Sequence, residues 1–176
     1  MKNSNLSILI AAASKLKGMR DEVVFVGGST VELFITDEAA FAVRETNDVD
    51  VLIEAITYSD YVTFAERLKE AGFKEDISEN APICRWVNEG TVLDVMPLDE
   101  NVLGFANKWY KPAFRSAQKI LLGNGIEIRV VRPEYFLLTK IEAFKGRGKG
   151  DHYGSHDLED IVAVIDGRPE LYDEIK

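Results

Sequence analysis

The sequence predicts an α/β fold in which a mixed sheet is flanked by helices. Short apolar runs of strand length alternate along the chain with segments whose apolar residues recur at helical spacing, as in residues 61–68. The chain has 176 residues, of which 46% are hydrophobic, and this is enough to bury a core. We therefore predict a single domain over residues 1–176, with its core at about 20–131 and a small C-terminal helical cap at about 133–176.

The elements of the first half follow from apolar patterns and from their start and stop signals. Gly18 ends a first helix, and the apolar run 23–26 predicts a strand that leads into a pair of glycines. The remaining predicted elements are a helix from Ser29 to about Ile35, a loop or short strand over 36–46, a strand that includes Asp48, and a helix from Ser59 or Asp60 to Gly72.

The second half adds further strands and the helices of the cap. Asn88-Glu89-Gly90 separates two apolar runs and predicts a hairpin, so parallel and antiparallel pairs should share one sheet. The other predicted elements are strands at 73–77, 83–87, 91–96 and 125–131, and helices at 102–110, from Pro133 to about Phe144, and from Ser155 to Ile165. Gly146, Gly148 and Gly150 are expected to break the helix that begins at Pro133.

The chain is acidic overall, but its charge is uneven. Its net charge is -9, whereas residues 108–149 hold ten Lys or Arg and three Glu, a local +7; the other 11 basic and 27 acidic residues give -16. This balance excludes a general nucleic-acid coat protein but allows one face to hold a polyanion. The predicted basic strip consists of Lys108, Lys111, Arg115 and Lys119 on one helix face and of Lys145, Arg147 and Lys149 in a glycine-rich loop.

The cysteine content and the apolar runs indicate the compartment. Cys84 is the only cysteine, which excludes an internal disulfide and fits a reducing cytoplasm. No apolar run approaches the roughly 20 residues of a membrane span. Apolar residues near the N-terminus keep helical spacing, which favours an amphipathic helix over a signal peptide. We expect a cytoplasmic protein that does not bind membranes.

Asp48 and Asp50 are the first candidate catalytic and metal-binding residues. In a strand they point to one face, while Val49 and Val51 point to the other. Two neighbouring carboxylates repel each other unless a cation lies between them. Mg²⁺ or Mn²⁺ suits such a pair, because Mg²⁺ binds one or two carboxylates together with water and substrate phosphates. The alternative interpretation is a solvated strand edge or turn.

Asp94 is the third candidate for both roles. It lies in the middle of the apolar run Val92–Met96, where an unpaired charge would be costly to bury. A metal shared with Asp48 and Asp50 would give this carboxylate a partner, if the two strands are neighbours.

Gly27-Gly28-Ser29 is a candidate phosphate-binding turn. It follows a predicted strand and precedes a predicted helix. Glycine lets the backbone come close to a phosphate, and the first turn of a helix offers unpaired N–H groups and a positive dipole end. Most glycine pairs are only turns, so the argument depends on the carboxylates that follow.

Together, these motifs resemble the DNA polymerase beta superfamily of nucleotidyltransferases. The shared features are a Gly-Gly-Ser turn between strand and helix, an Asp-x-Asp on an alternating strand, and a single Asp on a later strand. Within this superfamily the chain resembles the AbiEii-type family, whose founding members are toxins of type IV toxin-antitoxin systems. The matching motifs are Arg44-x-Thr46-x-Asp48-Val49-Asp50, Lys140-Ile141-Glu142-Ala143 and His156-Asp157-Leu158-Glu159-Asp160.

The resemblance implies a polymerase-beta-like nucleotidyltransferase fold with an NTP as substrate. It assigns phosphate contacts to Gly28 and Ser29, and nucleotide binding to Lys140 and Asp157. From the residues alone, Lys140 also fits a lysine that extends its ammonium group to solvent, and Asp157 fits an acid favoured by a helix N-terminus.

The predicted function is metal-dependent transfer of a nucleoside monophosphate from an NTP to an acceptor hydroxyl. The expected acceptor is tRNA, in a toxin-antitoxin or phage-defence setting with a cognate antitoxin as partner. Two alternatives stay open. One is nucleotidylation of a small molecule such as an antibiotic; the other is a non-catalytic, nucleotide-binding regulatory protein of the same fold.

Overall fold

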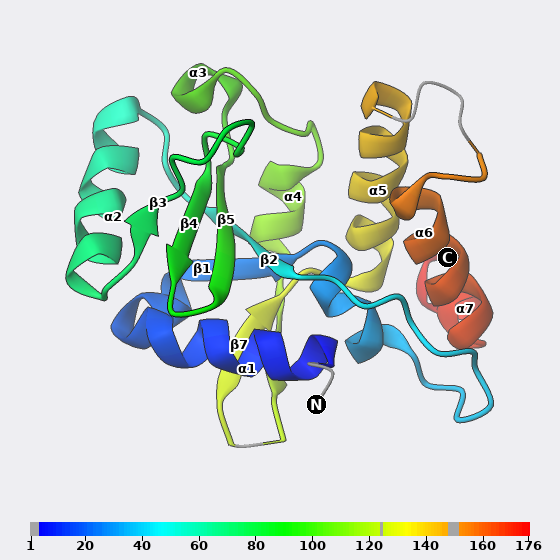
Figure 1. Ribbon diagram of the computed structural model, residues 1–176. Helices are drawn as coiled ribbons and strands as arrows, with labels where there is room; N and C mark the ends of the chain where they lie inside the picture. Colours follow the sequence, from blue (N-terminus) through cyan, green and yellow to red (C-terminus); the bar gives the residue numbers. More distant parts are fainter. Residues whose placement is uncertain (1–3, 124, 148–151) are drawn as a thin grey trace.

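A computed structural model of the protein describes residues 4–123, 125–147 and 152–176. The described residues form a seven-stranded sheet in the order β3-β4-β5-β2-β1-β7-β6 (Figure 1). Along the chain the strands are β1 (Val23–Val26), β2 (Asp48–Ile53), β3 (Lys74–Glu75), β4 (Arg85–Asn88), β5 (Thr91–Pro97), β6 (Gln118–Leu121) and β7 (Glu127–Val130). β2 is parallel to β5 and antiparallel to β1, so the predicted mixed sheet is confirmed.

Helices flank this sheet, as predicted. They are α1 (Asn5–Leu16), α2 (Tyr58–Glu70), α3 (Glu100–Leu103), α4 (Tyr110–Arg115), α5 (Pro133–Arg147), α6 (His156–Gly167) and α7 (Leu171–Glu174), with 3-10 helices η1 (Lys17–Glu22) and η2 (Gly28–Phe34). Figure 1 shows the three C-terminal helices gathered on one side of the molecule, apart from α1 and α2. In the part of the chain that the structure describes, no helix is long and apolar enough to cross a membrane.

The core lies on both faces of the central strands. All four residues of β1 are buried, as expected for a strand covered on both sides. Helix α1 contacts β2 and β5 and buries the apolar stripe that includes Leu9, Ala13 and Leu16. Cys84 is also buried, which raises the pKa of its thiol to about 12.

In the second half of the chain one predicted helix is wrong and one strand was not predicted. The predicted helix at 102–110 is instead the short α3, which the Asp99 side chain caps and which ends at Gly104 in the left-handed conformation, with a φ of 83°. Helix α4 begins only at Tyr110. Strand β6 was missed because it is a short edge strand whose four residues are half-buried or exposed.

Two predicted helices differ in detail. The helix expected from Ser29 is a 3-10 helix, η2, whose first residue is Gly28. Helix α5 runs through Gly146 to Arg147 instead of ending near Phe144, since one glycine lowers helix propensity without forbidding the conformation. Gly148 and Gly150 lie outside the described residues.

The predicted hairpin is confirmed and has a two-residue loop. Asn88 pairs with Thr91, which leaves Glu89 and Gly90 in the loop with φ angles of 41° and 79°. Two positive φ angles are typical of a type I′ turn. This loop fixes the register of β4 against β5 as far as the pair Arg85 and Asp94.

We expect Glu89→Asn to stabilise the protein. A side chain with a Cβ is strained at positive φ, and Asn tolerates this region better than Glu, so the free energy of unfolding should rise by about 0.5 kcal/mol. Urea denaturation measures the change, and Glu89→Val, with a β-branched side chain, should lower stability instead. Equal stability of the Asn and Val variants would contradict the turn assignment.

Candidate active site

Three carboxylates meet where β2 runs beside β5. Asp50 is the direct register partner of Asp94, and Asp48 lies two residues before Asp50 on the same strand. Asp48 and Asp50 are half-buried, while Val49 and Val51 between and after them are buried. The alternation therefore points both carboxylates to one face, and the strand that bears Asp94 is the neighbour that the sequence analysis required.

Arg85 occupies the space between two of these carboxylates. Its Nε and Nη2 donate to the two oxygens of Asp94, both at 2.8 Å, and Nη2 also donates to Oδ2 of Asp48 at 2.8 Å. The hydrogen bonds to Asp94 are the main cause of a raised pKa for this guanidinium. Sequence reasoning missed Arg85. The hairpin contained the signal, because a two-residue loop at 89–90 pairs residue 85 with residue 94.

The glycine turn is packed directly against Asp50. Gly27 has a φ of 75°, and a Cβ at this position would lie 1.9 Å from Oδ2 of Asp50. The next residues begin η2, where the backbone N–H and the hydroxyl of Thr30 donate to the Gly27 carbonyl. Ser29 is fully buried, and its hydroxyl has no hydrogen-bond partner among the described residues. The turn therefore lies directly beside the carboxylate of Asp50.

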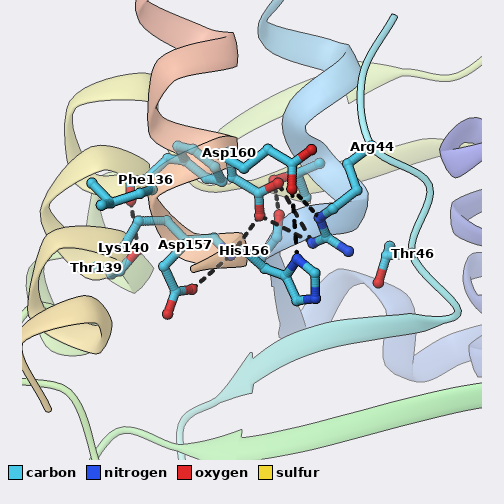
Figure 2. Close-up of polar contacts among 12 residues, drawn as sticks. Arg44, Thr46, Phe136, Thr139, Lys140, His156, Asp157 and Asp160 are labelled. Carbon is cyan, nitrogen blue, oxygen red and sulfur yellow. Dashed lines mark hydrogen bonds and ion pairs between the residues drawn. The ribbon is translucent and has the colours of Figure 1, made fainter. Parts of the chain in front are cut away.

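A chain of charged side chains connects α5, α6 and the segment before β2 (Figure 2). The ammonium group of Lys140 on α5 contacts Asp157 at 3.1 Å and Asp160 at 2.7 Å, both on α6. The same oxygen of Asp160 is 3.4 Å from Nη2 of Arg44. Lys140 is 9% exposed and Asp160 is 1% exposed, so the lysine is held inside the protein instead of extending to solvent.

Asp160 was not singled out in the sequence analysis. Its position in the motif His156–Asp160, one helical turn after Asp157, was the available signal. A Cβ on Gly28 would lie 3.0 Å from Nη2 of Arg44 and 3.2 Å from Oδ2 of Asp160. Glycine at this position thus lets the charged chain contact the turn.

Asn5 holds the segment that leads into β2. Its amide Nδ2 donates to the carbonyl of Arg44 at 2.9 Å, and its Oδ1 accepts from the backbone N–H of Thr46 at 3.1 Å. The Thr46 hydroxyl then donates to Oδ1 of Asp48 at 2.7 Å. Asn5 is 3% exposed, so this bridge is buried and links α1 to the site. Nothing in the sequence around Asn5 indicated that its side chain makes this bridge.

Several of these groups line a cleft of about 610 Å³. Its lining includes Gly28, Arg44, Asp48, Asp50, Arg85 and Lys140, and α6 adds Asp157 from the other side. A volume of several hundred Å³ is typical of small-molecule sites. The cleft therefore combines carboxylates, a glycine turn and three cationic side chains in a space of suitable size.

The donor set can be compared with the needs of a divalent cation. Carboxylate oxygens are the ligands that Mg²⁺ or Mn²⁺ prefers, so the chemistry of Asp48, Asp50 and Asp94 fits. In the present arrangement, however, Arg85 engages Asp48 and Asp94. Among the described residues, no three His, Cys, Asp or Glu side chains are grouped as a metal site. The right ligands are present, but a guanidinium is bound to two of them.

The predicted basic helix face is wrong. Lys108 precedes α4 and Lys119 is on β6, so the four basic residues at 108–119 do not share one helix. Three of them also form ion pairs: Lys108 with Glu142, Lys111 with Asp99 and Lys119 with Glu127. Lys145 and Arg147 belong to α5 and not to a loop, and Lys149 lies outside the described residues.

Comparison with protein-family models and with curated proteins finds no match. Among solved structures, an antigenic nucleotidyltransferase-like protein from Paracoccidioides brasiliensis is similar, with a TM-score of 0.55 and 22% identity over 97% of this chain and 81% of that chain. The antibiotic-resistance factor ANT(2'')-Ia has a TM-score of 0.58 and 10% identity over 94% of this chain and 85% of that chain. The predicted nucleotidyltransferase-like fold is confirmed, whereas the AbiEii-type family stays a prediction.

The packing of Gly27 against Asp50 predicts a large effect of a single methyl group. Gly27→Ala should lower the free energy of unfolding by more than about 1 kcal/mol, because the left-handed backbone and the Asp50 carboxylate both oppose a Cβ. Gly18→Ala is the matched control, since a Cβ there meets nothing within 4 Å. Urea denaturation measures both changes.

A double variant separates the two causes. Asp50→Ala removes the carboxylate, so Gly27→Ala should be less destabilising in that background than in wild type. Equal stability of Gly27→Ala and Gly18→Ala would show that Gly27 is not required at this position.

Proposed function

We propose that this protein transfers a nucleoside monophosphate from an NTP to an acceptor hydroxyl, with pyrophosphate as the second product. One observation supports this most strongly: the register of β2 and β5 brings Asp48, Asp50 and Asp94 together beside the glycine turn. Carboxylates and a phosphate-binding turn in one cleft are the two halves of a site for a metal-bound triphosphate.

The carboxylates would position the reacting groups. Asp48 and Asp50 would hold a divalent cation, which when bound neutralises phosphate charge and orients the triphosphate. In the transfer, the acceptor oxygen forms a bond to the α-phosphorus while the bond from that phosphorus to the pyrophosphate oxygen breaks. Asp94 would hold a second divalent cation and help to take the proton of the acceptor hydroxyl. Both roles require that its oxygens be released from Arg85.

The turn and the buried charges would hold the phosphates. The backbone of Gly28 and Ser29 would approach a phosphate closely, because glycine places no side chain in the way. Lys140 and Arg44 would supply positive charge to the leaving pyrophosphate. Asp160 contacts the side chains of both Lys140 and Arg44 and would keep them in position in the absence of nucleotide.

Two acceptor classes have separate support. tRNA is the acceptor that the uneven charge of the sequence favours, and the motif resemblance implies a toxin-antitoxin setting with a cognate antitoxin. A small hydroxylated molecule is supported by the likeness to ANT(2'')-Ia, which is described as an antibiotic-resistance factor. Ion pairing of Lys108, Lys111 and Lys119 leaves less free positive charge for a nucleic acid than the sequence indicated.

The transfer reaction is tested with each α-labelled NTP in Mg²⁺, with and without total tRNA and with small hydroxylated acceptors. We expect label to move to an acceptor, and Asp50→Asn to lower the rate by about a hundredfold or more. Mg²⁺ with NTP should raise the melting temperature of wild type but not of Asp50→Asn. Asp173→Asn, an exposed carboxylate on α7, is the control and should behave as wild type.

Two results would decide against this proposal or narrow it. An equal rise in the melting temperature of Asp50→Asn would show that the cation does not bind at Asp50. Nucleotide binding without transfer to any acceptor would favour the non-catalytic regulatory protein.

The acceptor class is tested by the salt dependence of tRNA binding. If tRNA lies along α5 and the segment after it, replacing Lys145, Arg147 and Lys149 by Ala should reduce the slope of log affinity against log salt by about 0.7 to 0.9 for each phosphate that is no longer neutralised. The matched control replaces Lys108, Lys111 and Lys119, which already have carboxylate partners, and should change the slope less. Identical slopes in all three proteins would leave the small-molecule acceptor ahead.

A further inference from the structure

Arg85 contacts the carboxylates that the proposed function assigns to a divalent cation. Its fork of N–H groups reaches both oxygens of Asp94 and one oxygen of Asp48, each at 2.8 Å. The side chains of Arg85, Asp94 and Asp48 are 24%, 10% and 34% exposed, so these ion pairs are partly shielded from water. Bidentate pairs of this kind are among the stronger hydrogen bonds in proteins.

The guanidinium offsets a repulsion that the fold creates. Parallel pairing places Asp50 opposite Asp94, with Asp48 two residues away, so three negative groups share one face. One positive charge between them reduces the net charge of the cluster and lets Asp94 be buried. Arg85 on β4 is the cross-strand partner of Asp94 on β5, so the hairpin fixes the position of the guanidinium.

A divalent cation and the guanidinium require the same oxygens. Mg²⁺ binds carboxylate oxygens at about 2.0 to 2.1 Å, which excludes an N–H donor from the same lone pair. At Asp48, Oδ1 accepts from Thr46 and Oδ2 accepts from Arg85, and a divalent cation at Oδ2 would be repelled by the guanidinium bound to the same oxygen. Arg85 also lines the open cleft, which gives the side chain space to move away from Asp94.

We propose that Arg85 is an internal counter-ion that competes with the divalent cation for Asp48 and Asp94. The cation-free protein is held by the guanidinium, and cation binding requires the guanidinium to leave these carboxylates. This inference rests on the proposed function, because that function places the cation here. It assigns a role to Arg85, which sequence reasoning missed, and it predicts that this side chain limits the affinity for the divalent cation.

The experiment measures binding of Mn²⁺ alone, followed by electron paramagnetic resonance or calorimetry, without nucleotide. Arg85→Gln removes the competing charge and should bind Mn²⁺ about tenfold more tightly than wild type. Arg67→Gln is the matched control. Arg67 makes a bidentate ion pair with Glu22 outside the cleft, so its removal should leave Mn²⁺ affinity unchanged.

Stability provides a second readout. In EDTA, Arg85→Gln should melt at a lower temperature than wild type, because Asp48 and Asp94 lose their counter-ion. Mn²⁺ should raise its melting temperature by more than it raises that of wild type. If Arg85→Gln does not fold in EDTA, Arg85→Lys keeps the charge without the bidentate geometry and should bind Mn²⁺ with an affinity above that of wild type.

Mn²⁺ affinity in the Arg85 variants equal to or below that of wild type would overturn this inference, since Arg85 would then support the site and not compete for it. Its failure is distinguishable from failure of the proposed function. Nucleotidyl transfer by wild type with unchanged Mn²⁺ affinity in Arg85→Gln would leave the function standing alone. Tighter Mn²⁺ binding in Arg85→Gln, with no transfer by any variant, would leave the counter-ion role without the enzymatic one.

Discussion

Repulsion among three carboxylates on one face of the sheet is the constraint on which the rest of the site depends. Side-by-side pairing of β2 and β5 makes this repulsion unavoidable, because Asp50 faces Asp94 in register. The protein answers it with Arg85 from the adjacent strand and with the Thr46 hydroxyl on Asp48. Burial of like charges without such partners would destabilise the fold, so these contacts are structural before they are functional.

A second group of charges connects the sheet to the C-terminal helices. Asp160 on α6 contacts Lys140 on α5 and Arg44 before β2, so one buried carboxylate joins three distant parts of the chain. The glycine turn lies between this group and the carboxylates of β2, and a side chain at Gly28 would meet the first while one at Gly27 would meet the second. The two groups of charges can approach the turn closely because Gly27 and Gly28 have no side chains.

Local patterns were sufficient for much of the fold and for the candidate residues. Strict alternation around Asp48 and Asp50 predicted their common face, and the hairpin at Glu89 and Gly90 followed from turn chemistry. The same reasoning failed at 102–110. Asp99 caps a short helix there, and Gly104 ends that helix in the left-handed conformation despite the helical spacing of the apolar residues. Strand β6 gave little signal because an edge strand buries little of its surface.

By itself, the sequence determined the class of the fold, the carboxylates and the glycine turn, because these depend on residue type and short-range periodicity. Tertiary structure alone decided their partners. Arg85 on Asp48, Asp160 on Lys140 and Arg44, and Asn5 on the segment before β2 are contacts between residues up to 116 positions apart. A buried charge or amide must find a partner, but which one it finds depends on strand order and helix docking, which no local pattern encodes.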